Sequence, residues 1–173
     1  MGEGKAPPRV MVDANILIAG IAFPRWSYEI LRHVLHGDVR LVRCPLIIEQ
    51  ATRHIRKTFP EHLDDFRQFL AHCEYESVPD PSPDKVAQHH DLVRDITDVP
   101  IALAAIHARV NYLVSEDKDL TAVDETTREL RKRIQPLIAG TFLRTVMGWK
   151  SEDIEHVRRR TWRDMPPLLV PAS

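Results

Sequence analysis

The sequence predicts an α/β fold with a largely parallel central sheet, and three observations predict it. Short apolar segments, which suit buried strands, alternate with longer segments whose apolar residues recur at helical spacing. The strand segments are short and mostly apolar, as strands covered on both faces are. The chain has 173 residues, of which 43% are hydrophobic, so it can bury one sizeable core. Strands and helices that alternate in this way pack as helices against a mostly parallel sheet.

Five segments have the character of strands. They are residues 10–12, 39–42, 76–78, 112–115 and 136–138. Ligands of parallel α/β sheets bind beyond the carboxyl ends of the strands. Acidic residues follow the first and fourth segments directly, so these two strand ends are the first places to look for a site.

The predicted helices begin at residues that stabilise helix N-termini. Ser27, Thr141 and Ser151 are the expected N-caps, and Pro45 and Pro60 suit a first turn, where the missing N–H has no partner. The expected helices cover residues 27–35, 45–55, 60–70, 84–94, 101–109, one closing at 130–133, 141–147 and one starting at 151.

The domain organisation is predicted to be simple. Residues 1–8 form a flexible N-terminus, 9–147 a single domain, and 148–173 a C-terminal helix with a proline-rich tail. The chain has no apolar run long enough to span a bilayer, and its first residues do not resemble a signal peptide. Cys44 and Cys73 are expected to be free, buried thiols. We therefore expect a cytoplasmic protein without a membrane partner.

Charge is unevenly distributed, although the net charge is only −1. Residues 84–125 hold nine acids and four bases, whereas residues 126–163 hold ten bases and four acids. An acidic centre beside a basic flank suits a metal site that acts on a polyanion, but solvated charges also segregate by chance. The arginines that could hold phosphates, or form only a solvated helix face, are Arg158, Arg159, Arg160 and Arg163.

Four carboxylates stand out, and each also has an ordinary explanation. Asp13 interrupts an apolar run, where an unpaired charge is costly, but it could cap the next helix, a role that Asn15 could also fill. Asp117 lies in an acidic turn after the fourth strand, and Asp98 lies where a helix cap is common. Glu49 sits at the border of the apolar side of its helix, where a solvated side chain is the simpler expectation.

In order and context the four acids resemble the PIN-domain nucleases, over roughly residues 9–147. The matching pieces are Asp13-Ala14-Asn15 after the first strand, Glu49 on the following helix, Asp98 before the alanine-rich residues 101–105, and Ser115-Glu116-Asp117 after a strand. Each piece alone is weak, but the ordered set is fairly specific.

This resemblance implies a fold, an activity and a cofactor. The fold is a Rossmann-like three-layer α/β/α sandwich, the activity is phosphodiester hydrolysis, usually in RNA, and the cofactor is Mg²⁺ or Mn²⁺. Carboxylate oxygens suit these ions, and a bound ion removes the repulsion between clustered acids. The implied catalytic and metal-binding residues are Asp13, Glu49, Asp98 and Asp117, with Asn15, Ser115 and Asp119 in supporting positions. A VapC-type toxin with an antitoxin partner, and a homodimer, are further expectations from the resemblance.

Competing classes fit less well. A haloacid-dehalogenase phosphatase would show D-x-D-x-T where this chain has Asp13-Ala14-Asn15. A response regulator would carry a phosphoacceptor Asp after a middle strand, and residues 41–45 contain none. The nine histidines form no zinc-site spacing with the two cysteines. The main alternative is a catalytically inactive PIN-like module that binds RNA or protein. Such a module is expected to have lost one or more of the acids, and all four are present here.

Overall fold

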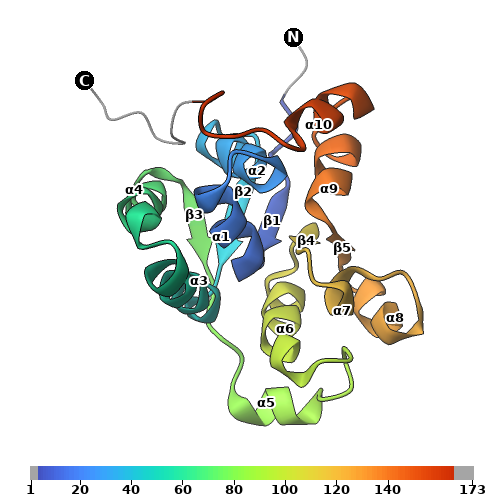
Figure 1. Cartoon of the computed structure of the whole chain (residues 1–173). Helices are drawn as coiled ribbons and strands as arrows, with labels where there is room; N and C mark the ends of the chain where they lie inside the picture. The colour runs from blue at the N-terminus through green and yellow to red at the C-terminus, as the bar shows by residue number, and fades with distance from the viewer. Residues whose placement is uncertain (1–3, 166–173) are drawn as a thin grey trace.

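The computed structural model describes residues 4–165. The ends of the expected flexible N-terminus and of the proline-rich tail, residues 1–3 and 166–173, lie outside this range. The strands form one parallel sheet in the order β3-β2-β1-β4-β5 (Figure 1). Their bounds are β1 Arg9–Val12, β2 Arg40–Arg43, β3 Tyr75–Ser77, β4 Tyr112–Val114 and β5 Gln135–Leu137. All five strands predicted from the sequence are therefore present, and every pairing between them is parallel.

Helices cover both faces of the sheet. Successive side chains of a strand point to opposite faces, yet Val10, Met11 and Val12 are all at most 2% exposed. The same holds for Leu113 and Val114 on the neighbouring strand. This burial confirms the three-layer α/β/α sandwich, and it explains why residues 10–12 are apolar throughout rather than alternating.

The helices connect consecutive strands and pack around this core. Their bounds are α1 Ala14–Ala22, α2 Trp26–Leu35, α3 Pro45–Thr58, α4 Leu63–His72, α5 Pro83–Gln88, α6 Val99–Ala108, α7 Lys118–Thr121, α8 Arg128–Arg131, α9 Ala139–Thr145 and α10 Ser151–Val157. Gly20 lets α1 and α2 approach closely, because a Cβ there would lie 2.6 Å from a Leu31 methyl carbon. None of the helices within residues 4–165 is long and apolar enough to cross a membrane.

Several predicted helix boundaries were wrong. The helix α2 begins at Trp26, so Ser27 lies buried inside it rather than capping it. Ile138 and Lys150 occupy the N-cap positions of α9 and α10, in place of the expected Thr141 and Ser151. The helix expected over 84–94 ends at Gln88, and the apolar run after β1, to which no helix was assigned, forms α1.

Residues 146–165 pack onto α1 and α2, and hydrogen bonds from three tryptophan side chains hold them there. The indole N–H of Trp26 donates to the Ile154 carbonyl at 2.8 Å, and that of Trp162 to the Ala22 carbonyl at 3.0 Å. The indole of Trp149 donates to Nε2 of His33 at 2.9 Å. The tryptophans therefore pack within the structure rather than standing free to stack on bases.

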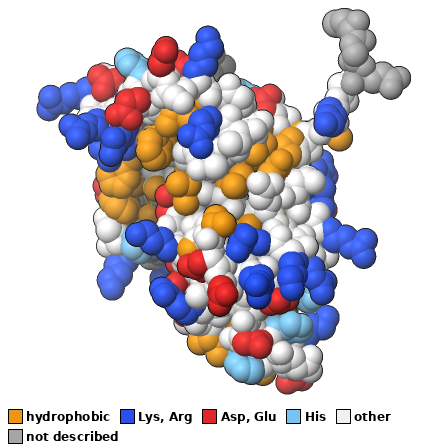
Figure 2. Space-filling view, turned by 90° about the vertical axis from the view of Figure 1, so that its right-hand side faces the viewer, with side chains coloured by type: hydrophobic (Ala, Val, Ile, Leu, Met, Phe, Trp, Pro, Cys, Tyr) orange, Lys and Arg blue, Asp and Glu red, His pale blue; other side chains and the backbone are white. Residues whose placement is uncertain are grey.

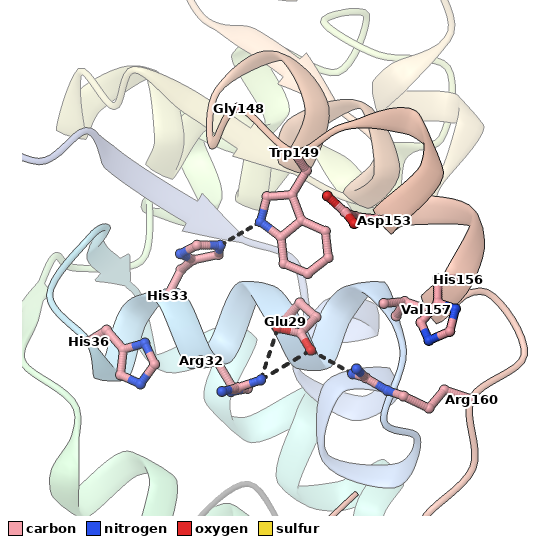
Figure 3. A pocket seen from close by; sticks show the side chains of 10 residues that line it. All are labelled: Glu29, Arg32, His33, His36, Gly148, Trp149, Asp153, His156, Val157 and Arg160. Carbon is pink, nitrogen blue, oxygen red and sulfur yellow. Dashed lines mark hydrogen bonds and ion pairs between the residues drawn. The ribbon is translucent and has the colours of Figure 1, made fainter. Parts of the chain in front are cut away.

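A cavity of about 570 Å³ lies between α2 and this C-terminal segment (Figure 3). Glu29, which is 4% exposed, accepts hydrogen bonds there from Arg32 and from Arg160, the latter at 2.6 Å. The Arg160 side chain is 13% exposed and also donates to the Pro24 carbonyl. Arg160 is thus part of the fold's internal bonding.

Candidate active site

The site begins where β1 and β4 end side by side. Val12 and Val114 are register partners, and the next residue, Asp13, donates its backbone N–H to the Val114 carbonyl at 2.9 Å. Ser115, the residue after β4, lies fully buried beside Asp13. The parallel pairing of two strands far apart in the sequence therefore brings the two motifs Asp13-Ala14-Asn15 and Ser115-Glu116-Asp117 together.

Asp13 is held by a set of short hydrogen bonds. One carboxylate oxygen accepts from the Ala14 N–H at 2.7 Å, and the other from the Ser115 hydroxyl at 2.8 Å. Asp13 itself therefore caps α1, and the idea that Asn15 does so is wrong. Asn15 instead bridges the two motifs, since its amide donates to Ser115 Oγ and accepts from the Glu116 N–H. Burial raises the pKa of Asp13, the hydrogen bonds from Ser115 and Ala14 oppose this, and the Asp117 charge raises it further.

The Ser115 hydroxyl is a junction between the two motifs. It donates to Asp13 and accepts from the backbone N–H of Asp117 at 3.0 Å and from the Asn15 amide at 3.1 Å. Asp117 in turn caps α7, because its side chain accepts from the Asp119 N–H at 2.9 Å. These bonds fix the directions of two carboxylates without neutralising either charge.

Asp98 joins this group from the start of α6. It occupies the N-cap position of α6 but makes no capping hydrogen bond, so the ordinary explanation of an acid at a helix start does not apply. Its Oδ2 atom is buried and has no hydrogen-bond partner. Burial, first, and then contact with Asp117, with smaller contributions from Asp13 and Asp95, raise the pKa of Asp98 to about 8. When protonated, Asp98 can donate to Asp117, which relieves the repulsion between them.

A second set of acids overlaps with the first through Asp98. Asp95, Asp98 and Asp119 each offer an oxygen, and these oxygens lie within 4.8 Å of one another. The sequence reasoning missed Asp95, which precedes the short 3₁₀ turn Ile96–Asp98 and accepts from both the N–H and the hydroxyl of Thr97. The signal that could have found it is the spacing Asp95-x-x-Asp98, which places both acids on one turn.

Glu49 pairs with a residue of its own helix rather than with the other three acids. It lies in the first turns of α3, which starts after β2 at the same edge of the sheet, but its side chain is 63% exposed and pairs with Arg53. It is also absent from the charges that act most on Asp98, namely Asp117, Asp13 and Asp95. The exposed side chain agrees with the simpler expectation from its helix position, whereas the resemblance had implied a Glu49 in the metal site.

The residues at this edge fit a divalent cation. All donors are carboxylate oxygens, the ligand type that Mg²⁺ and Mn²⁺ prefer. The orphaned Asp98 oxygen needs a partner, because a buried, unpaired polar atom is costly. The acidic cluster now comprises Asp13, Asp95, Asp98, Asp117 and Asp119. Among residues 4–165, Asp119 alone of these five forms an ion pair, which is its salt bridge with Arg94. The cluster therefore carries an excess of negative charge that a cation would neutralise.

The four C-terminal arginines lie elsewhere. In Figure 1, α10 lies toward the end where the strands begin, whereas α6 and α7 lie toward the end to which the strands point. Arg158, Arg159 and Arg163 are exposed, while Arg160 is bound to Glu29. Figure 2 shows a face of the molecule on which many Lys and Arg side chains stand among fewer acids.

Together, the parallel sandwich and the carboxylate cluster at the strand ends define a class of α/β protein with a candidate metal site at the sheet edge. The sequence profile of the PIN domain family matches residues 9–119, and the chain belongs to this family. Among solved structures, the crystal structure of PAE2754 from Pyrobaculum aerophilum is similar in fold, with a TM-score of 0.55 and 18% sequence identity. That match covers 84% of this chain and 100% of the other. No curated protein matches the chain.

Proposed function

We propose that the protein is a Mg²⁺- or Mn²⁺-dependent endoribonuclease whose site is built on Asp13, Asp98 and Asp117. The observation that carries this proposal is Asp98: its carboxylate makes no capping bond and leaves one oxygen buried without a partner between other acids. A purely structural Asp at a helix start would use that oxygen. Membership of a family whose members are generally nucleases supports the same assignment.

The chain's own residues would hold the site in place. The hydrogen bonds from Ser115 and Ala14 fix both oxygens of Asp13, and the Asp119 N–H fixes Asp117. Asn15 joins the two motifs, so the positions of the ligands change little when a cation binds. When bound, the ion would polarise the phosphate and lower the pKa of an attacking water. Asp95 and Asp119 would extend the ligand set on the outer side, whereas exposed Glu49 would contribute at most through water.

The experiment that tests this proposal compares nucleic acids and cations directly. RNA and DNA oligonucleotides of one sequence are incubated with Mg²⁺, Mn²⁺ or EDTA, using wild type and Asp117→Asn. Asp64→Asn is the control, because the Asp64 side chain is 86% exposed on α4 and pairs only weakly with Arg67. We expect RNA cleavage that requires a cation, that Asp64→Asn retains and that Asp117→Asn lacks. Binding of RNA without any cleavage would favour the inactive PIN-like module.

The biological role is a finer proposal that rests on the resemblance. A cytoplasmic toxin held by an antitoxin, acting as a homodimer, would arrest growth when expressed alone. Expression of wild type and Asp117→Asn from an inducible promoter tests this role. Growth arrest by wild type alone supports a toxin, whereas equal growth of both strains points to an RNA-processing enzyme.

A further inference from the structure

One cation already sits at the edge of the acidic cluster. The Arg94 guanidinium lies 2.6 Å from a carboxylate oxygen of Asp119, whose side chain is 20% exposed. Asp119 is one of the three acids whose oxygens lie within 4.8 Å of one another. The arginine therefore occupies a ligand that a divalent cation at this cluster would use.

Arg94 acts on more than one acid. The pKa of Asp95 is lowered first by hydrogen bonds from Thr97 and further by the nearby Arg94 charge. The pKa of Asp124 is likewise lowered first by hydrogen bonds from Thr126 and then by the Arg94 charge. The Arg94 guanidinium thus acts on Asp95, Asp119 and Asp124, and Arg131 also acts on Asp124.

The pair between Arg94 and Asp119 is suited to being broken. The Arg94 side chain is 70% exposed, so water replaces the contact at little cost. Arg160, by contrast, is 13% exposed and bonded to both Glu29 and the Pro24 carbonyl, which makes it a fixed part of the fold. The ion pair of Arg160 therefore holds the C-terminal segment in place, whereas the ion pair of Arg94 lies at a site where another cation would bind.

We propose that Arg94 is the exchangeable counter-ion of the acidic site: it pairs with Asp119 while no divalent cation is bound and leaves Asp119 when one binds. The inference rests on the proposed function, because it assumes that the cluster is a cation site. It adds that the cation competes with a residue of the chain itself. Arg94 therefore sets how much Mg²⁺ or Mn²⁺ the site needs before it fills.

The test is a Mn²⁺ titration of wild type, Arg94→Gln and Arg94→Lys by calorimetry and by electron paramagnetic resonance. Arg67→Gln is the matched control, since Arg67 is 60% exposed and pairs with Asp64 at 3.5 Å. Removal of a competing exposed ion pair should tighten Mn²⁺ binding by about two- to fivefold in Arg94→Gln. Arg94→Lys, which keeps the charge, should stay within about twofold of wild type, and Arg67→Gln should not differ from it.

The outcomes separate this inference from the proposed function. Mn²⁺ binding that is unchanged or weaker in Arg94→Gln overturns the counter-ion role, even if RNA is cleaved. Equal tightening in Arg94→Lys or in Arg67→Gln also overturns it, because the effect then does not depend on the charge at residue 94. Tighter Mn²⁺ binding in Arg94→Gln alone supports it, even if no RNA is cleaved, in which case only the nuclease proposal fails. Failure of all variants to bind Mn²⁺ would overturn both.

Discussion

Replacing Asp98 by Asn should stabilise the protein in the absence of divalent cations. The folded protein keeps Asp98 protonated at pH 7, because burial and the neighbouring acids raise its pKa to about 8. An Asp in the unfolded chain, with a pKa of about 3.9, has lost its proton at this pH. A tenfold difference in proton affinity corresponds to about 1.4 kcal/mol, so the unscreened cost of folding at pH 7 is about 4 kcal/mol.

Solvent reduces this cost, since Asp98 is only partly buried; we expect about 1 to 2 kcal/mol to remain. Asn is neutral at every pH and avoids the cost. The melting temperature in EDTA should therefore rise by about 2 to 8 °C in Asp98→Asn, given about 2 to 4 °C per kcal/mol for a chain of this size.

Thermal and urea unfolding at pH 7 measure this effect, with Asp64→Asn as a control that should leave stability unchanged. Saturating Mn²⁺ should then raise the melting temperature of wild type and leave that of Asp98→Asn almost unaltered. A variant that is less stable than wild type in EDTA, or that gains as much from Mn²⁺, would show that Asp98 is an ordinary structural residue.

Three other results are expected. Without cations, the melting temperature should fall as pH rises from about 4 to 8. In this interval the unfolded chain releases the Asp98 proton while the folded protein retains it. A melting temperature in EDTA that stays flat or rises with pH would contradict the raised pKa of Asp98. Glu29→Gln should lower the free energy of unfolding in urea by about 2 to 4 kcal/mol, since two guanidinium groups lose their buried carboxylate, whereas Glu155→Gln, at a site 69% exposed, should cost almost nothing. Replacing the exposed Arg158, Arg159 and Arg163 together by Gln should weaken RNA binding without altering the rate of cleavage at saturating RNA. The slope of log affinity against log salt concentration should fall by about 2. An unchanged slope would show that these arginines form only a solvated face.

The sequence predicted the sheet well, because burial on both faces leaves a strong signal. The short apolar run over residues 10–12 is at most 2% exposed, whereas the longer apolar run over residues 16–22 lies in α1 and was not assigned to an element. Helix starts were less predictable. Ser27 and Thr141 have the right chemistry for an N-cap, but the tertiary packing of α2 and α9 starts both helices earlier and places these residues inside them.

The acidic cluster was predictable only in part, because some of its members are placed by the sheet topology and others by local conformation. Asp13 and Asp117 follow two neighbouring parallel strands, and the topology alone brings such residues to one edge. Asp95 depends on the conformation of a short 3₁₀ turn, and the ion pair of Arg94 depends on a long, exposed side chain; neither leaves a periodic pattern. Glu49 was selected by its helix position, which does not determine whether the side chain turns toward the cluster or toward Arg53.

The decisive measurement for a metal-dependent nuclease site is the rate of RNA cleavage by wild type and Asp13→Asn across a Mn²⁺ titration. Asn keeps the size of the side chain and can accept the bonds from Ala14 or Ser115, but it lacks the charge that the cation requires. We predict that wild type loses activity in EDTA and regains it with Mn²⁺, and that Asp13→Asn is slower by several orders of magnitude at every concentration. Cleavage that persists in EDTA, or that Asp13→Asn performs at nearly the wild-type rate, would contradict a metal-dependent site at the ends of β1 and β4.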